Sequence, residues 1–164
     1  IIKRDKCDMI YIIRRGSVKV TKEIKFVKDD RKYKKEQNKS MSKRKFKNFD
    51  ELNNIQQLEN DKMIERLAEG PSEQEERDGN YIKKEIILET LKIGDIFPTY
   101  YAINFIYLDE VKFEADTPCE CLAIKLADIQ DIVPDVYEFF KKFAKPYPDD
   151  QFLRKFYYYN DRLE

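Results

Sequence analysis

The chain has 164 residues, of which 41% are hydrophobic and 39% are charged. Its 32 basic and 32 acidic side chains give a formal net charge of zero, which argues against a generally basic nucleic-acid-binding protein. The sequence contains no histidine, so it cannot supply a Ser-His-Asp or Cys-His catalytic arrangement. We therefore expect a protein that is not an enzyme and has no catalytic residues.

The cysteines are Cys7, Cys119 and Cys121, and none forms a C-x-x-C pair. We expect reduced thiols rather than a disulfide or a metal site, and hence a reducing compartment such as the cytoplasm. No apolar run approaches the ~20 residues of a membrane span, and no signal peptide is visible. Because the chain starts at Ile1 without a methionine, we expect it to be the interior of a longer protein.

Residues 1–28 predict two β-strands. Residues 9–13 are an apolar run rich in β-branched side chains, and the turn at 14–17 contains the first glycine. Apolar and polar residues then alternate through residues 18–26, which is typical of a strand with one face in water. Two strands around a Gly-Ser turn predict a β-hairpin.

Residues 29–80 form an insertion of different character. Basic side chains dominate residues 29–48, and acidic ones dominate residues 49–80. Within the acidic half, apolar residues recur mainly at three-residue steps, which predicts one amphipathic helix at about 49–69. The insertion is either a charged loop with one helix or a docking element whose two halves engage a partner or each other.

Regular structure is predicted again from Tyr81 onward. Strands are expected at residues 81–88, 91–97, 111–115 and 121–126. Helices are expected at 127–133, at 136–144 with Asp135 as its N-cap, and from 149–150 onward. Strands first and helices last indicate an α+β fold with helices packed on an antiparallel sheet.

Three strings outside the insertion stand in a specific order: residues 10–20 (IYIIRRGSVKV), 91–97 (LKIGDIF) and 115–124 (ADTPCECLAI). In this order they resemble a hairpin, the string leading into the phosphate-binding cassette, and the closing strands of the cyclic nucleotide-binding domain family. The resemblance covers residues 1–28 and 81–145. It implies an antiparallel β-roll, of the double-stranded β-helix or jelly-roll type, with C-terminal helices.

For members that bind a nucleotide, the resemblance implies a Gly-Glu pair after the Gly-Asp-x-Phe string and an arginine about ten residues later. Backbone N–H groups at a helix start and the arginine would hold the cyclic phosphate, and the glutamate would take the ribose hydroxyl. Here Pro98 and Thr99 stand in place of the Gly-Glu pair, and the arginine position falls near Leu108 or Asp109. Proline has no N–H, threonine has no charge, and Asp109 would repel a phosphate by roughly a few kcal/mol.

The sequence thus predicts a vestigial ligand pocket and no cofactor, neither cyclic AMP nor cyclic GMP. The pocket candidates are Gly94, Asp95, Phe97, Pro98, Thr99, Tyr100 and Asp109. Candidates for binding a partner protein are Lys43, Arg44 and Lys45 in the insertion, and Phe156, Tyr157 and Tyr158 in an aromatic-rich helical tail at 146–164.

Two functions agree with these features. The first is a non-catalytic structural or interaction module, a degenerate family member in a larger protein or an assembly such as the cytoskeleton or a cilium. Its partners would be other proteins, and its basic stretch would suit an acidic protein surface better than nucleic acid. The second is a cyclic-nucleotide-responsive regulatory domain of a kinase subunit or channel, with an atypical pocket or one plugged by an internal segment such as the tail.

Overall fold

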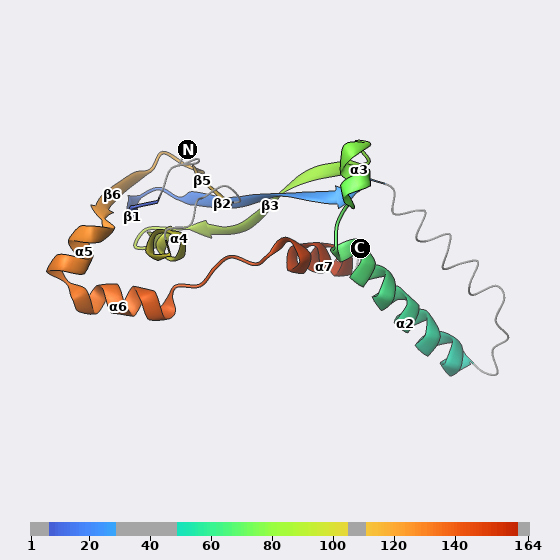
Figure 1. The fold of residues 1–164 in the computed structure, drawn as a ribbon. Helices are drawn as coiled ribbons and strands as arrows, with labels where there is room; N and C mark the ends of the chain where they lie inside the picture. Colours follow the sequence, from blue (N-terminus) through green and yellow to red (C-terminus); the bar gives the residue numbers. More distant parts are fainter. Residues whose placement is uncertain (1–6, 29–48, 105–110, 161–164) are drawn as a thin grey trace. The chain divides into compact units, whose positions relative to one another are not determined.

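The structure is a computed structural model that describes residues 7–28, 49–104 and 111–160 (Figure 1). The strands in these residues are β1 (Met9–Arg15), β2 (Val18–Val27), β3 (Tyr81–Leu91), β4 (Ile96–Phe97), β5 (Val111–Ala115) and β6 (Glu120–Lys125). The helices are α2 (Phe49–Ala68), α3 (Glu73–Arg77), α4 (Thr99–Ile103), α5 (Leu126–Ile132), α6 (Pro134–Phe143) and α7 (Asp150–Asn160).

The described strands form two three-stranded sheets, in the orders β4-β1-β6 and β3-β2-β5. Strand β1 pairs antiparallel with β4 and with β6, and β2 pairs antiparallel with β5. The predicted α+β class with antiparallel strands is therefore confirmed.

The predicted hairpin between the first two strands is wrong, because β1 and β2 belong to different sheets. Gly16, with a φ of +80°, carries the chain from one sheet to the other. A Cβ atom at this position would lie 2.2 Å from the carbonyl oxygen of Pro118, so only glycine fits. The turn is held by the loop before β6, since the Ser17 N–H donates to Thr117 Oγ1 at 2.9 Å.

Strand β2 is buried on more than the one face that its alternation predicts. Its apolar residues Val18, Val20, Ile24 and Phe26 are buried, as expected. Thr21, on the face expected to be in water, is also buried, and its hydroxyl donates to Glu85 Oε1 at 2.6 Å. A polar side chain with a satisfied hydrogen bond can lie in a core, so the polar half of an alternating strand need not face solvent.

The chain divides into two compact units, and β2 and β3 contribute residues to both. The first unit comprises residues 1–23 and 85–147, and the second comprises residues 24–84 and 148–164. The core of the first unit draws on both sheets and on α4 and α5. Its buried members are Cys7, Ile10, Ile13, Val18, Val20, Leu91, Phe97, Tyr101, Ala102, Ile103, Val111, Phe113, Leu126 and Ile129.

In the second unit, α2 agrees with the helix predicted at about 49–69. Its C-terminal half buries Met63 and Leu67 in a small core with Val27, against which Tyr158 packs. Gly70, with a φ of +84°, follows the end of the helix, where a left-handed glycine is common. Ser72 then begins α3 with a capping box, in which its side chain and that of Glu75 satisfy each other's backbone N–H.

A buried arginine joins the elements of this second unit. The Arg154 guanidinium, on α7, donates to the backbone oxygens of Ala68 and Glu69 at 3.2 Å and of Lys25 at 2.8 Å. The first two carbonyls lie at the end of α2, where the helix dipole favours a cation. Its ion pair with Asp150, at 3.5 Å, lies within α7 itself.

The start of α6 differs from the prediction. The helix begins at Pro134, Val133 is its N-cap without a side-chain cap hydrogen bond, and Asp135 lies in its first turn. Proline suits the first helical position because its missing N–H has no helical partner there. By contrast α7 begins at Asp150 as expected, with Asp149 Oδ1 accepting from the Phe152 N–H at 2.8 Å.

Candidate functional site

The first two predicted pocket residues build a turn. Gly94 has a φ of +91°, and the Asp95 carboxylate accepts from the Lys92 backbone N–H at 2.7 Å. Backbone hydrogen bonds of 2.9 and 3.0 Å join Gly94 and Asp95 to Ile13 of β1. Both residues therefore fix the entry to β4 and attach it to the neighbouring strand.

Phe97 lies at the centre of an aromatic stack in the first unit. Its buried ring stacks against Tyr11 at a centroid distance of 5.5 Å and against Phe113 at 5.2 Å. These separations are typical of favourable aromatic pairs. Phe97 is thus a core residue of this unit.

Pro98 and Thr99 open the short helix α4. Pro98 is its N-cap, with no side-chain cap hydrogen bond, and α4 is only five residues long. Because proline has no N–H, this helix start offers one backbone donor fewer than the corresponding glycine would. Tyr100 is half-buried and packs edge-on against the buried ring of Tyr101 at 5.6 Å.

Tyr147 joins this group from the segment that follows α6, and sequence reasoning missed it. Its ring stacks on Tyr101 at 6.3 Å and tilts against Phe113 at 6.2 Å. Its hydroxyl donates a hydrogen bond to the Glu89 carboxylate on β3. Burial, followed by the interaction with Glu89, raises the pKa of Tyr147 well above its ordinary value. The only sequence signal was an aromatic residue between two prolines, which says nothing of its partners.

Two carboxylates act electrostatically on Tyr147. The Glu89 and Asp95 carboxylates both raise the pKa of Tyr147 electrostatically, so they contribute negative potential at this position. Lys112 is the only basic residue in the sequence from 98 to 117, and its ammonium lies 4.0 Å from the Glu85 carboxylate. This local electrostatic field disfavours an anionic ligand.

Four predicted site residues lie outside the described residues. They are Asp109 at the arginine position, and Lys43, Arg44 and Lys45 in the basic half of the insertion.

The three aromatic candidates of the tail lie on α7, in the second unit, and they divide between two faces. Tyr157 and Tyr158 are half-buried and contact Phe26 at centroid distances of 4.8 and 5.8 Å. Phe156 is 59% exposed, together with Phe152 and Tyr159 one helical turn on either side. The structure therefore separates Phe156 from the two tyrosines that follow it.

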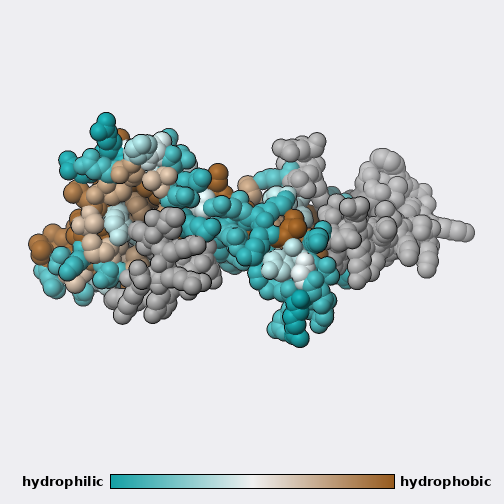
Figure 2. Space-filling view, turned by 90° about the horizontal axis from the view of Figure 1, so that it is seen from above, coloured by the Kyte–Doolittle hydropathy of each residue, from teal (hydrophilic) through white to brown (hydrophobic). Residues whose placement is uncertain are grey.

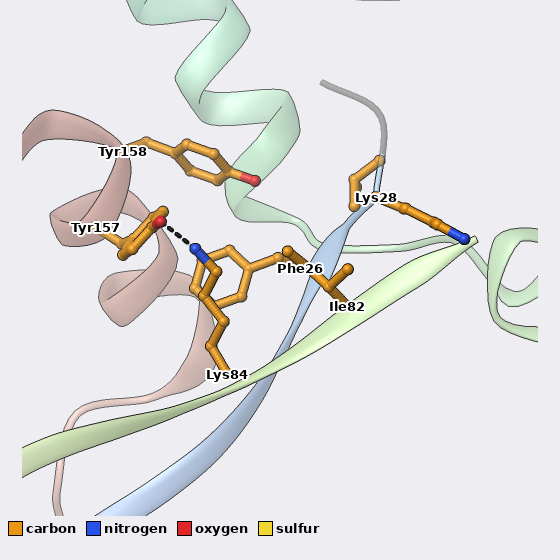
Figure 3. A pocket seen from close by; sticks show the side chains of 7 residues that line it. Phe26, Lys28, Ile82, Lys84, Tyr157 and Tyr158 are labelled. Carbon is orange, nitrogen blue, oxygen red and sulfur yellow. Dashed lines mark hydrogen bonds between the residues drawn. The ribbon is translucent and has the colours of Figure 1, made fainter. Parts of the chain in front are cut away.

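A small cavity lies beside these tyrosines (Figure 3). Its volume is about 130 Å³, and Phe26, Ile82, Lys84 and Tyr157 contribute to its lining. Figure 3 shows the Lys84 ammonium pointing at the Tyr157 hydroxyl, to which it donates, with its nitrogen 4.2 Å from that ring's centroid. The cavity is smaller than the roughly 300–1,000 Å³ of small-molecule sites, so we assign these contacts to packing.

The described cysteines and acidic residues are not grouped as a metal centre. Cys7, Cys119 and Cys121 are free thiols, and the sulfurs of Cys119 and Cys121 lie 3.5 Å apart. Burial, and then the hydrogen bond with Cys119, raise the pKa of Cys121 to about 11, which keeps that thiol protonated at neutral pH. Within residues 7–28, 49–104 and 111–160, no three Cys, Asp or Glu side chains are grouped so as to hold a metal ion.

Helix α6 has two apolar faces, of which sequence reasoning distinguished only one. Tyr137, Phe140 and Ala144 pack against the core of the first unit. Val136, Phe139 and Phe143, which the sequence places on the same side as Phe140, are instead 42–57% exposed. Figure 2, seen from above, shows hydrophobic residues gathered at its left end, where Figure 1 draws β1, β6 and α5; α6 lies beneath these strands and faces away from this view.

None of the described helices combines the length and the apolar character needed to cross a membrane. The chain matches no family model, no curated protein and no solved structure.

Proposed function

We propose that this chain is a non-catalytic interaction module, a degenerate cyclic nucleotide-binding-type domain that serves as one part of a larger protein or assembly. The observation that carries the proposal is the aromatic packing at the predicted cassette. The rings of Tyr101, Phe113 and Tyr147 are packed together beside Phe97, the residue that leads into the cassette. This packing engages the Phe97 ring with neighbouring rings rather than directing it at a ligand.

The chemistry of the cassette supports the same proposal. Pro98 removes a backbone donor from the start of α4, and the Asp95 carboxylate is engaged by its own turn. Glu89 and Asp95 contribute negative potential where a cyclic phosphate would need positive potential. The lost backbone donor and the negative potential weaken phosphate binding by different physical routes.

The arrangement of the strands supports a β-roll. The chain passes from one antiparallel sheet to the other at the Gly16 turn. The strands of both sheets precede α5 and α6 of the first unit in the sequence. The order of elements agrees with the family's roll followed by its closing helices.

The partners we propose are other proteins, in the cytoplasm and in an assembly such as the cytoskeleton or a cilium. The exposed aromatic face of α7, carrying Phe152, Phe156 and Tyr159, supports a protein partner, because aromatic residues are enriched at interfaces. The free thiols of Cys7, Cys119 and Cys121 suit a reducing compartment.

The test is calorimetric titration of the full chain with cyclic AMP and cyclic GMP. We expect no saturable heat up to millimolar nucleotide. Saturable binding of either nucleotide below about 100 μM, an affinity of about −5.5 kcal/mol, would overturn the proposal.

One observation favours a second candidate, a nucleotide-responsive domain that plugs its own pocket. Tyr147 comes from the segment after α6 and packs on Tyr101 next to the cassette, as an internal plug would. Within the tail at 146–164, the candidate plug is therefore Tyr147, since Tyr157 and Tyr158 pack within the second unit.

Replacing Tyr147 by alanine separates the two candidates. If the tyrosine is a plug, Tyr147→Ala should bind cyclic AMP while the unchanged chain does not. If folded Tyr147→Ala does not bind cyclic AMP either, the result supports the interaction module. Tyr158→Ala in the second unit is the control. A nucleotide response in both variants would instead indicate a non-specific effect of lost packing and would contradict the plug.

A further inference from the structure

The exposed face of α6 is a continuous apolar stripe. Val136, Phe139 and Phe143 follow one another at three- and four-residue spacing, which places them on one side of a helix. Their exposed fractions are 42%, 57% and 56%, and Ile132, just before the helix, is 76% exposed. Exposed aromatic residues in a row mark an interaction surface rather than ordinary solvent-facing helix.

The stripe is held in a fixed orientation. Tyr137 and Phe140 of the same helix, and Ala144 just after it, pack on the core of the first unit, so α6 cannot turn its apolar stripe inward without losing those contacts. The Phe139 and Phe143 rings also pack on each other at a centroid distance of 4.7 Å. The two rings therefore form a preformed ridge on the outside of the unit.

Charges flank the stripe with opposite sign at its two ends. Asp135 lies in the first turn of α6 and Lys142 in its last turn. They are seven residues apart, so they lie on the same side of the stripe. In the part of the chain that the structure describes, Asp135 makes no ion pair, and Lys142 lies over the Phe143 ring at 5.3 Å.

This charge pattern is complementary to itself in the antiparallel direction. If two copies of α6 pair about a two-fold axis near Phe139, Asp135 of each copy faces Lys142 of the other. The same axis sets Val136 of one copy against Phe143 of the other. A two-fold interface requires that one patch complement itself in this way.

We propose that the Val136–Phe139–Phe143 stripe of α6 is a self-association surface whose partner is a second copy of this chain. The inference rests on the proposed function as an interaction module and names its partner. The antiparallel pair also sets the two helix dipoles in opposite directions.

The size of the surface predicts a weak dimer. A helix of ten residues is about 15 Å long. Pairing of two such helices buries less than the roughly 800 Å² per partner of a stable complex. We therefore expect dissociation in the range of about tens to hundreds of micromolar, consistent with a contact that is reinforced when many copies are held in one assembly.

Sedimentation equilibrium of the full chain with charge-reversed variants tests the proposal. The wild-type chain should form dimers as its concentration rises to about 500 μM. Asp135→Lys and Lys142→Asp should each weaken the dimer about tenfold or more. In either variant, both contacts between position 135 of one copy and position 142 of the other become contacts between like charges. An equimolar mixture of the two variants should dimerise again, because every like-charge pair then becomes an opposite pair.

A matched control is Asp116→Lys, which makes the same charge change at an exposed residue of the first unit away from α6. It should dimerise as the wild type does. A monomeric wild type at 500 μM would overturn the proposal, as would a dimer that both single variants leave intact. A monomer that sediments with phosphatidylserine vesicles would also overturn it, in favour of a membrane surface.

The outcome is separable from that of the proposed function. If the chain is monomeric and does not bind cyclic nucleotides, only the proposal of self-association is wrong. If the chain dimerises and also binds cyclic AMP, the proposal for the α6 surface stands and the proposal of a degenerate cassette is wrong.

Discussion

At the residue scale, Tyr147 is held in the first unit by two means, ring packing and a hydrogen bond. The ring contacts Tyr101 and Phe113, and the hydroxyl donates to Glu89. The hydrogen bond requires a protonated phenol, and burial beside a carboxylate disfavours the phenolate. The pKa of Tyr147 is accordingly raised in the folded protein.

This shift predicts a loss of stability at alkaline pH. An unfolded tyrosine ionises near its ordinary pKa of about 10, whereas folded Tyr147 keeps its proton. Above about pH 10 the unfolded state binds fewer protons than the folded state, so the free energy of unfolding falls as pH rises. Below pH 10 the contribution is fully present. Urea unfolding of Tyr147→Phe, compared with the wild type between pH 8 and 11, should show a shallower alkaline decline.

The control for this comparison is Tyr81→Phe, because Tyr81 lies in the second unit and its ring is covered by Lys25 at 5.1 Å. Tyr81→Phe keeps Tyr147, so it should retain the alkaline decline that Tyr147 causes. Equal declines for Tyr147→Phe and the wild type would show that the Tyr147 phenol does not titrate differently in the folded and unfolded states.

Single residues were predictable from the sequence only where their neighbours in the sequence decide their role. Pro98 lacks a backbone donor in any context, as the sequence indicates by itself. Gly94 and Asp95 were predicted as pocket residues, and the turn that they form with residues next to them was not predicted, although it is local. Tyr147 and Arg154 act on partners far away in the sequence, such as Glu89 and Lys25. No local pattern encodes such contacts, and both residues stayed unnoticed.

At the element scale, the chain depends on Gly16 to pass from the sheet that contains β1 to the sheet that contains β2. The backbone is left-handed there, and the Pro118 carbonyl closes on the position that a Cβ would occupy. Gly94 provides a natural comparison in the same unit. It has a similar φ of +91° but no atom within 4 Å of an added Cβ.

The two glycines therefore predict a graded effect of alanine. Gly94→Ala incurs only the left-handed backbone cost of about 1–2 kcal/mol. Gly16→Ala incurs that cost and a clash with a backbone oxygen, which we expect to bring its total to about 3 kcal/mol or more. In thermal unfolding, where 1 kcal/mol corresponds to about 2–4 °C for a chain of this size, Gly16→Ala should lower Tm about twice as far. Equal shifts would mean that the Pro118 loop moves aside at little cost.

The positions of most described elements were predictable from the sequence, and their pairing was not. Alternation and apolar runs located β1, β2 and β5 within a few residues, and three-residue spacing located α2. Periodicity describes one element at a time, so it could not tell that β1 and β2 join different sheets. It also could not tell which apolar face of α6 meets the core, since both faces carry aromatic residues.

At the scale of the whole molecule, the division into two units assigns the buried Arg154 and its named partners to one of them. Every acceptor of Arg154 named above, the Lys25, Ala68 and Glu69 carbonyls and the Asp150 carboxylate, belongs to the second unit. The paired strands β1 and β6 belong to the first unit. The division thus makes a prediction about how far the effect of losing Arg154 extends.

Replacing Arg154 by methionine keeps an unbranched apolar stem and removes the donors to the end of α2. Hydrogen bonds from a charged donor contribute about 1.5–3 kcal/mol, and the carbonyls left behind are partly buried. By hydrogen exchange, the amides of α7 and of the last turns of α2 should exchange about 10- to 100-fold faster in Arg154→Met. The β1–β6 amides should keep their protection, because none of the lost contacts involves them.

The matched control is Lys155→Met, the next residue of α7. Its ammonium pairs with Glu65 at 2.7 Å, but both side chains are well exposed, at 32% and 59%. Such pairs contribute about 1 kcal/mol or less, so exchange in α7 should change severalfold at most. If Arg154→Met accelerates amide exchange in β1 as much as in α7, the two units open as one cooperative structure. The loss of the Arg154 hydrogen bonds would then affect the first unit through β2 and β3, which contribute residues to both units. If amide exchange accelerates only in the second unit, β2 and β3 allow that unit to open by itself. The first unit, with the predicted cassette and the α6 stripe, then stays folded when α7 does not.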